Sequence, residues 1–230
     1  MVDFTFNDDF VYTHDNPYHE KLAEFSHFVL RDKEAEKFKG RWRQEVFANG
    51  RPIVAEIGSG HGDFMAAYCS DHKEINFLGM DFRFKRSFQI AKKLAQLSLS
   101  NFRYLRARGE RLNYMFAESE IDSLFYFFPD PWPKRKQQKR RLFQEHFLET
   151  AYKVLRPGGE IFIKTDHDGY AEWMMEIIAK QQLFELTFFS NDLRGEFPEH
   201  FLSQYITKFE KIFIGQNMKI KAFVLKSKKG

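Results

Sequence analysis

The sequence contains almost no cysteine and no long apolar run. Its 230 residues include one cysteine, Cys69, which excludes an internal disulfide framework and any metal site built from several cysteines. No apolar segment reaches the ~18 residues that indicate a membrane-spanning helix, and no signal peptide opens the chain. We therefore expect a soluble, cytoplasmic protein without a metal site.

Net charge is also small, although the charges are unevenly distributed. The formal net charge is only +4, yet Lys and Arg concentrate in residues 134–141 and 219–229. Local clusters of one sign attract polyanions more strongly than the total charge does, so nucleic acid is favoured over acidic metabolites as the partner. Apolar residues make up 43% of the chain, and 28 residues are Phe. Length and composition thus predict one aromatic-rich α/β domain with an appendage.

The stretch at residues 124–141, LFYFFPDPWPKRKQQKRR, combines three kinds of local structure. Residues 124–128 are typical of a buried strand, and the prolines at 129, 131 and 133 then stop regular structure. Because proline fixes its own backbone angle, these prolines should hold Asp130 and Trp132 in one direction. Residues 134–141, called the basic segment below, predict contact with an anion.

A glycine loop follows an earlier apolar strand. In IVAEIGSGHGD, residues 53–57 run into Gly58, Gly60 and Gly62, and Glu56 at the strand end can accept a hydrogen bond from a ligand hydroxyl or amine. Asp63 stands where a dinucleotide-binding loop has its third glycine, and its charge would repel a pyrophosphate at a helix N-terminus. S-adenosylmethionine, a cation without phosphate, suits this loop better; the alternative is a plain tight turn.

Three more acids follow predicted strands. Asp81 comes 23 residues after Gly58, close to the interval at which an acid binds a ribose, and it is also placed to cap the next helix. Asp130 follows the strand at 124–128, and Asp166 ends the strand at 160–166. Since the carboxyl ends of parallel strands meet at one edge of a sheet, these acids and Glu56 should converge there.

The remaining pattern completes a doubly wound fold. We expect helices at 21–38, within 140–159 and at 170–180, and strands at 183–189 and near 220–226. These elements predict a mostly parallel seven-stranded sheet whose last strand is antiparallel. Residues 1–48 would form an N-terminal arm and capping helix, with no fold assigned to 1–20, and residues 49–230 the main domain.

Several motifs resemble one known family. PDPWPKRKQQKRR closely resembles the signature PDPWPKxxHxKRR of bacterial tRNA (guanine-N7-)-methyltransferases, and KGRW at 39–42, TD at 165–166 and TKFE at 207–210 resemble further family motifs. The resemblance implies a Rossmann-like class I S-adenosylmethionine-dependent methyltransferase that methylates N7 of guanosine 46 in the tRNA variable loop. Two departures are Gln137, where the family has histidine, and Arg108, where it has an acidic or amide residue.

The resemblance also implies roles for individual residues. Asp130 would be catalytic, because guanine N7 carries a lone pair and needs positioning and charge stabilisation rather than a base. The expected cofactor-binding residues are Glu56, Gly58, Gly60, Asp81 and Asp130. The expected substrate-binding residues are Lys134, Asp166, Thr207, Lys208, Phe209 and Glu210. The expected RNA-binding residues are Lys136, Gln137, Gln138, Lys139, Arg140 and Arg141.

Some alternatives stay open at this stage. Trp132 would either stack on a base or pack against Phe127. In the motif at 39–42, Arg41 or Trp42 would contact RNA, or Trp42 would simply be packed in the protein. With Arg108 at its position, the contact to the adenine would come from backbone amides or from Glu110. The protein could also be an exocyclic-amine methyltransferase, a nicotinamide dehydrogenase or a silent RNA-binding module. Asp63 disfavours the dehydrogenase, and the basic segment has no role in the amine enzyme. The sequence does not distinguish a monomer from a homodimer.

Overall fold

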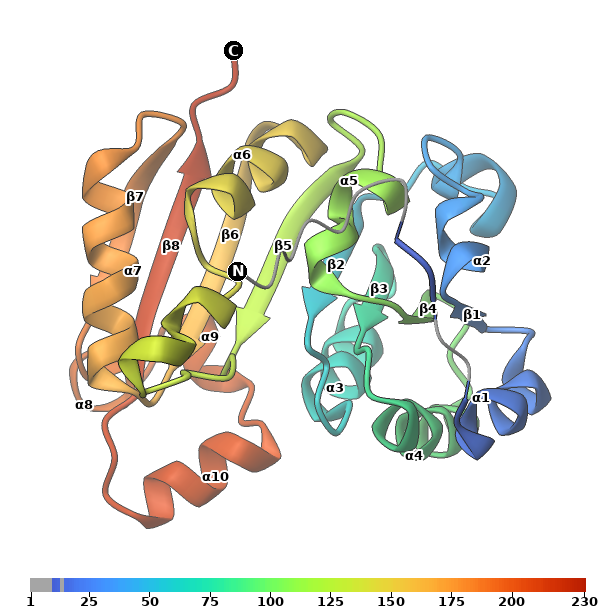
Figure 1. Cartoon of the computed structure of the whole chain (residues 1–230), viewed down its shortest axis with the longest axis horizontal. Coiled ribbons are helices and arrows are strands. Elements are labelled where there is room, and N and C mark those ends of the chain that lie inside the picture. The colour runs from blue at the N-terminus through green and yellow to red at the C-terminus, as the bar shows by residue number, and fades with distance from the viewer. Residues whose placement is uncertain (1–9, 13–14) are drawn as a thin grey trace.

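The computed structural model of the chain describes residues 10–12 and 15–230. These residues form an eight-stranded sheet with the order β1-β4-β3-β2-β5-β6-β8-β7 (Figure 1). β8 is antiparallel to β6 and β7, and the other pairings are parallel. The strands are β1 (Val29–Arg31), β2 (Ile53–Ile57), β3 (Asn76–Met80), β4 (Phe102–Arg106), β5 (Ile121–Phe127), β6 (Leu155–Thr165), β7 (Phe184–Ser190) and β8 (Lys221–Ser227). The predicted Rossmann-like fold with an antiparallel last strand is confirmed.

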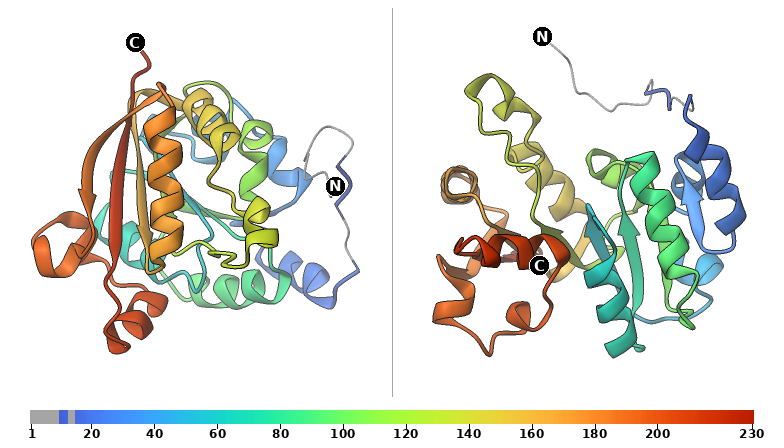
Figure 2. Two further views of the ribbon diagram at one scale, coloured as in Figure 1. Left: turned by 60° about the vertical axis from the view of Figure 1, so that its left-hand side comes forward. Right: turned by 90° about the horizontal axis from the view of Figure 1, so that it is seen from below.

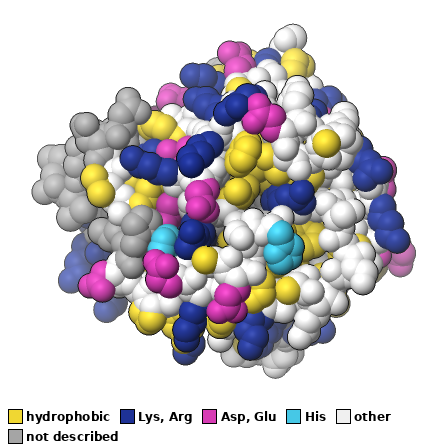
Figure 3. All heavy atoms as spheres, turned by 90° about the vertical axis from the view of Figure 1, so that its right-hand side faces the viewer, with side chains coloured by type: hydrophobic (Ala, Val, Ile, Leu, Met, Phe, Trp, Pro, Cys, Tyr) yellow, Lys and Arg dark blue, Asp and Glu magenta, His cyan; other side chains and the backbone are white. Residues whose placement is uncertain are grey.

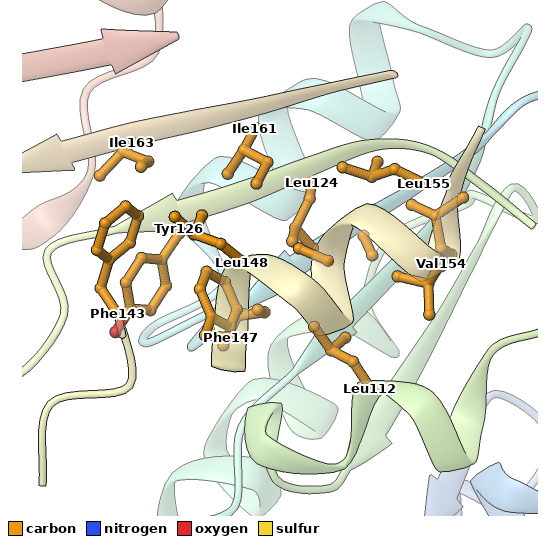
Figure 4. Packing of buried hydrophobic residues seen from close by; sticks show 14 of the residues in the cluster. Leu112, Leu124, Tyr126, Phe143, Phe147, Leu148, Val154, Leu155, Ile161 and Ile163 are labelled. Carbon is orange, nitrogen blue, oxygen red and sulfur yellow. The ribbon is translucent and has the colours of Figure 1, made fainter. Parts of the chain in front are cut away.

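Helices cover both faces of this sheet (Figures 1 and 2). One hydrophobic cluster joins the sheet to α5 (Leu112–Met115), α6 (Glu145–Val154) and α7 (Asp168–Lys180). The other joins it to α3 (Asp63–Asp71), α4 (Phe84–Leu94), α8 (Leu193–Glu196) and α9 (Phe201–Gln204). Figure 4 shows Phe143, just before α6, and Phe147 and Leu148 of α6 facing side chains of the sheet. These are Leu124 and Tyr126 of β5 and Ile161 and Ile163 of β6. The core is aromatic-rich, as predicted.

The N-terminal segment differs from the predicted helix at 21–38. It contains α1 (Pro17–Lys21), the 3-10 helix η1 (Leu22–Phe25), β1 and α2 (Lys33–Glu36). Val29 pairs with Tyr104, so β1 adds an eighth strand to the edge of the sheet beside β4. The helical spacing of Leu22, Phe25 and Phe28 was overridden by backbone pairing with an existing strand edge. Part of the arm at 1–20 lies outside the described residues.

The family motif at 39–42 has a structural role at Trp42. Trp42 begins the π-helix η2 (Trp42–Val46), is fully buried, and donates its indole N–H to the Met115 carbonyl oxygen at 2.8 Å. Arg41 is exposed and pairs with Glu45 at 2.7 Å. Of the two alternatives for Trp42, packing is therefore correct, because a fully buried indole has no surface to offer RNA.

The segment after the proline-rich corner is less helical than its sequence suggests. Residues 135–140 form the 3-10 helix η4 (Arg135–Arg140), and α6 begins only at Glu145. Phe143 is nevertheless fully buried beside α6. Two further elements complete the chain: η3 (Gly109–Arg111) after β4, and α10 (Lys208–Gly215) just before β8.

Candidate active site

A cavity of about 640 Å³ lies at the carboxyl ends of the central parallel strands. Its walls come from segments that follow β2, β3, β4, β5 and β6, together with α10. The acids Asp81, Glu110, Asp130 and Asp166 line it, as do apolar side chains such as Met80, Phe128 and Phe213. This main cavity is where the sequence predicted that the acids would converge, and three of the four predicted acids line it.

The glycine loop after β2 has a backbone that favours glycine. Gly58 has φ +77° and Gly60 has φ +55°. These are left-handed backbone conformations, which are energetically unfavourable for any residue that has a Cβ atom. The amides of Gly58 and Ser59 both donate to the Met80 carbonyl oxygen, at 2.8 and 2.9 Å, and so tie the loop to the end of β3. The loop therefore forms a fixed wall between the two strands that carry Glu56 and Asp81.

Glu56, the fourth predicted acid, lies behind this loop. It is 3% exposed and lines a small cavity that shares Gly58, Gly60 and Phe209 with the main one. Its Oε2 has no hydrogen-bond partner among the described residues, and burial raises the pKa of the carboxyl to about 8. A buried acid with an unused oxygen is suited to a cationic or hydrogen-bond-donating ligand group, since such a group would restore the missing interaction.

Asp81 and Asp130 both bind Arg83. Asp81 is 8% exposed, accepts a hydrogen bond from the Arg83 backbone N–H at 2.9 Å, and has a pKa raised by burial. Asp130 is exposed, and its Oδ2 accepts from the Arg83 guanidinium at 2.7 Å. Arg83 therefore links the predicted ribose-binding acid to the predicted catalytic acid across the cavity.

The backbone around Asp130 is unusual for non-glycine residues. Phe128 has φ +50° and Trp132 has φ +42°, and these two positions bracket the sequence Pro129–Asp130–Pro131. Left-handed backbone at bulky residues costs roughly 1 to 3 kcal/mol and is concentrated at functional sites. The corner thus turns Asp130 and Trp132 toward the cavity, which both of them line. The Arg140 guanidinium lies 5.1 Å from the Trp132 ring centroid.

Asp166 and Lys134 occupy different positions relative to the cavity. Asp166 follows β6, lines the main cavity and has a pKa raised by burial. Lys134 is exposed and is not among the lining residues. Asp166 is therefore placed to meet a ligand inside the cavity, whereas Lys134 is placed at the surface with most of the basic segment.

Arg141 differs from the exposed cations of the basic segment. It is 2% exposed, its Nε donates to the Pro131 carbonyl oxygen at 2.8 Å, and its guanidinium lies over the rings of Tyr170 and Trp173 at 4.8 and 5.1 Å. The guanidinium is enclosed by protein and braces the corner that carries Asp130, so it offers much less surface to RNA than the exposed cations of the basic segment do. Gln137 and Gln138 are partly exposed.

The TKFE segment is also mostly structural. Thr207 caps α10 by accepting the Glu210 N–H at 3.1 Å, and Lys208 donates its backbone N–H to Asp63 at 3.2 Å. Glu210 is fully buried and paired with Lys164 and Arg194, so its carboxylate is turned toward the protein interior rather than toward the main cavity. Phe209 lines both cavities.

Other cavity residues were not predicted from the sequence. Phe82, Arg83 and Arg86 line the cavity from the start of α4, and Phe213 lies one turn after Phe209 on α10. Placement after a strand was the available signal for Phe82 and Arg83, and i, i+4 spacing was the signal for Phe213. Arg108 lines the cavity with its guanidinium 4.4 Å from the Phe82 ring centroid, and Glu110 lies beside it.

The fold and cavity define a Rossmann-like, S-adenosylmethionine-dependent methyltransferase. The lining fits that cofactor, since it offers buried acids and apolar surface. No cluster of three or more potential metal ligands occurs in residues 10–12 and 15–230. Within the same ranges, no helix has the length and apolarity needed to cross a membrane.

Comparisons with known proteins identify the family. The profile of a family described as putative methyltransferase matches residues 50–223. A tRNA (guanine-N(7)-)-methyltransferase from Enterococcus faecalis is 37% identical over 190 residues, covering 83% of this chain and 87% of the relative. One from Lactococcus lactis is 37% identical over 195 residues, covering 84% and 88%. The chain therefore belongs to the tRNA (guanine-N7-)-methyltransferase family.

Solved structures support the fold. The 16S rRNA methyltransferase KamB matches with a TM-score of 0.61 at 17% identity, covering 82% of this chain and 93% of that one. An rRNA methylase from Streptococcus thermophilus matches with a TM-score of 0.52 at 14% identity, covering 95% and 100%. At these identities the likeness concerns the fold alone.

Proposed function

We propose that this protein transfers the methyl group of S-adenosylmethionine to N7 of a guanosine in tRNA, at position 46 of the variable loop, in the cytoplasm. The observation that carries the proposal is an acid-lined cavity at the carboxyl ends of the strands with an exposed basic segment at its rim. The proposed domain boundary at residues 48 and 49 is supported by the family match, which begins at residue 50.

The acids suit this reaction through their charge. S-adenosylmethionine supplies an electrophilic methyl group on a sulfonium when bound. Glu56 and Asp81 would hold the cofactor's amine and ribose, and Asp166 would accept hydrogen bonds from the guanine N1–H and N2. Asp130 would lie beside the base and stabilise the positive charge that the guanine acquires on methylation. Because N7 has no proton to lose, no residue needs to act as a base.

The basic segment would bind the tRNA backbone. Its five exposed cations form no ion pair within the part of the chain that the structure describes, so their charges remain available for phosphates: Lys134, Arg135, Lys136, Lys139 and Arg140. Figure 3 views a different face, on the side of β1 and α2, where Lys and Arg are interspersed with acids. The basic segment is therefore a better polyanion surface than that face.

A second cationic surface flanks the cavity on α4. This helix contains four Lys or Arg residues and no acid, and two of them, Lys85 and Lys92, are exposed. Arg86 on the same helix lines the cavity. A tRNA strand that crosses the mouth between Arg86 and Arg140 would thus meet cations on both sides.

The experiment measures tRNA affinity between about 50 and 300 mM salt. Each phosphate contact adds ~0.7 to 0.9 to the slope of log K against log salt. A variant that replaces Lys134, Lys136, Lys139 and Arg140 by Gln should reduce the slope by up to about three. The matched control replaces four exposed lysines that lie outside both basic clusters and do not line the main cavity: Lys37, Lys73, Lys153 and Lys180. An unchanged slope in the first variant would contradict the RNA-binding assignment.

Asp130→Ala separates chemistry from binding. It should keep the wild-type salt slope, because its carboxylate lines the cavity rather than the basic segment. Single-turnover methylation of guanosine should fall by roughly 100-fold, as expected when one preorganised electrostatic group is removed. Full activity in this variant would remove Asp130 from the mechanism. Wild-type protein that binds tRNA but never methylates it would favour the silent RNA-binding module.

A further inference from the structure

Helix α10 forms a wall of the cofactor site without belonging to a layer of the fold. Figures 1 and 2 show it beyond the carboxyl ends of β5 and β6 rather than packed along a face of the sheet. Phe209 and Phe213 on its inner side line the main cavity, and a Cβ on Gly60 would lie 3.6 Å from the Phe209 ring. Ile212 and Ile214, on the two flanks of the helix, are 45% and 37% exposed. The contacts that hold α10 are therefore made mainly from its inner side.

One anchor is a cluster of three charges, of which Lys164 and Glu210 are fully buried and Arg194 is partly exposed. Glu210 of α10 accepts from Lys164 Nζ of β6 at 2.7 Å and from Arg194 Nε of α8 at 3.0 Å. Lys164 also donates to the carbonyl oxygens of Leu202 and Tyr205, at 3.2 and 2.8 Å. The ammonium thus has an acceptor for each of its three protons. One cluster joins α10 to β6, α8 and α9.

These two buried residues have no access to a ligand. The side chains of Lys164 and Glu210 are both 0% exposed, and neither lines the main cavity or the small cavity beside Glu56. Lys164 lies 4.5 Å from the Phe127 ring centroid and 5.7 Å from that of Phe128, and both of these rings border the cavities. The cluster therefore lies directly behind the wall of the site.

We propose that Lys164, Glu210 and Arg194 are positioning residues that seat α10, so that Phe209 and Phe213 close one side of the cofactor pocket. The proposal rests on the cofactor site assigned above. When the carboxylate is lost and the Lys164 ammonium is left buried without a partner, α10 spends less time in the seated position, and the cofactor binds only the seated fraction. Glu210 thus controls cofactor affinity without touching cofactor or tRNA.

The test compares two variants with wild type. Glu210→Gln keeps the shape but leaves the Lys164 ammonium buried without a carboxylate. Lys164→Met combined with Glu210→Gln removes that unpaired charge, and the new amide can still accept from Arg194 and donate to a freed carbonyl oxygen. Glu199→Gln, an exposed glutamate in the same region, is the matched control.

The first measurement is S-adenosylmethionine affinity by calorimetry, with steady-state kinetics beside it. If α10 is seated a tenth of the time in Glu210→Gln, this variant should bind S-adenosylmethionine about tenfold more weakly than wild type. KM for the cofactor should rise by the same factor, and kcat at saturating cofactor should change less than about twofold. The double variant should recover most of the affinity, and Glu199→Gln should match wild type.

The second measurement needs no cofactor. Hydrogen exchange of the amides at 208–215 should be faster in Glu210→Gln than in wild type and should slow again in the double variant. Unchanged exchange and affinity in Glu210→Gln would overturn the proposal. If Glu210→Gln does not fold, the double variant decides. Wild-type cofactor affinity in the double variant supports the proposal. A double variant that folds yet binds the cofactor weakly refutes it, because that result indicates that Lys164 or Glu210 contacts the cofactor directly. A wild-type protein without cofactor affinity would instead refute the proposed function.

Discussion

Glu56→Gln should stabilise the protein near neutral pH while weakening cofactor binding. Burial raises the pKa of this carboxyl from 4.5 to about 8. Because the folded pKa lies above the unfolded one, the folded protein holds the proton more tightly than the unfolded chain does. The resulting stability is fully present below about pH 4.5 and is lost as the pH rises toward 8. Gln has nearly the same shape and does not titrate.

The size of the effect follows from the two pKa values. One pKa unit corresponds to about 1.36 kcal/mol, so this carboxyl alone should lower the free energy of unfolding by about 3 kcal/mol between pH 5 and pH 7.5. Glu56→Gln removes this loss. The stability difference is the free energy of unfolding of the variant minus that of wild type. This difference should therefore be about 3 kcal/mol more positive at pH 7.5 than at pH 5.

The assay is urea unfolding of both proteins at several pH values between 5 and 7.5. Taking the difference between variant and wild type cancels the other titrating groups. A difference that does not change with pH would show that Glu56 is ionised with an ordinary pKa. Calorimetry at pH 7.5 should show weaker S-adenosylmethionine binding by the variant, because the Glu56 carboxyl can ionise beside the cofactor's cationic amine and a neutral amide cannot.

Three further predictions concern other sites. Asp81→Ala should weaken S-adenosylmethionine binding by about 1.5 to 3 kcal/mol through loss of a charge-assisted hydrogen bond, and unchanged calorimetry would contradict the ribose assignment. Arg141→Gln should lower the urea midpoint because its guanidinium is 2% exposed and braces the Asp130 corner, whereas Arg140→Gln, at an exposed position, should leave that midpoint unchanged. Cys69 is fully buried and burial raises the pKa of its thiol, so a thiol reagent should modify it only after urea is added, and reaction with the native protein would show that α3 opens readily.

The acids of the site could be predicted because strand ends are visible in the sequence. Asp81, Asp130 and Asp166 each follow an apolar run, and parallel strands bring such positions to one edge. The unused oxygen of Glu56 could not be predicted, because it depends on what surrounds the carboxyl in three dimensions. Motif spacing locates a residue along the chain, whereas its burial depends on packing.

The burial of Arg141 and Glu210 also could not be predicted from the sequence. Both lie in motifs that carry function, and both have side chains that commonly face solvent. Arg141 is enclosed because Tyr170 and Trp173 of α7 cover it, and Glu210 is enclosed because Lys164 and Arg194 reach it from distant segments. The contacting residues lie far from each motif in the sequence, so the motif alone does not reveal that its residue is buried. The edge strand β1 was missed for a similar reason, since its partner lies in β4.

The position of β8 has a consequence for how the chain folds during its synthesis. β8 is made after β7 but lies between β6 and β7 in the sheet. Until residues 221–227 have left the ribosome, β7 lacks its only strand partner in the described sheet, and the pairing edge of β6 is open. Because α10 directly precedes β8, the wall of the cofactor site takes its place at the same late stage. The sheet and the site are therefore completed together, and a ribosome-bound chain that ends before β8 should not bind cofactor.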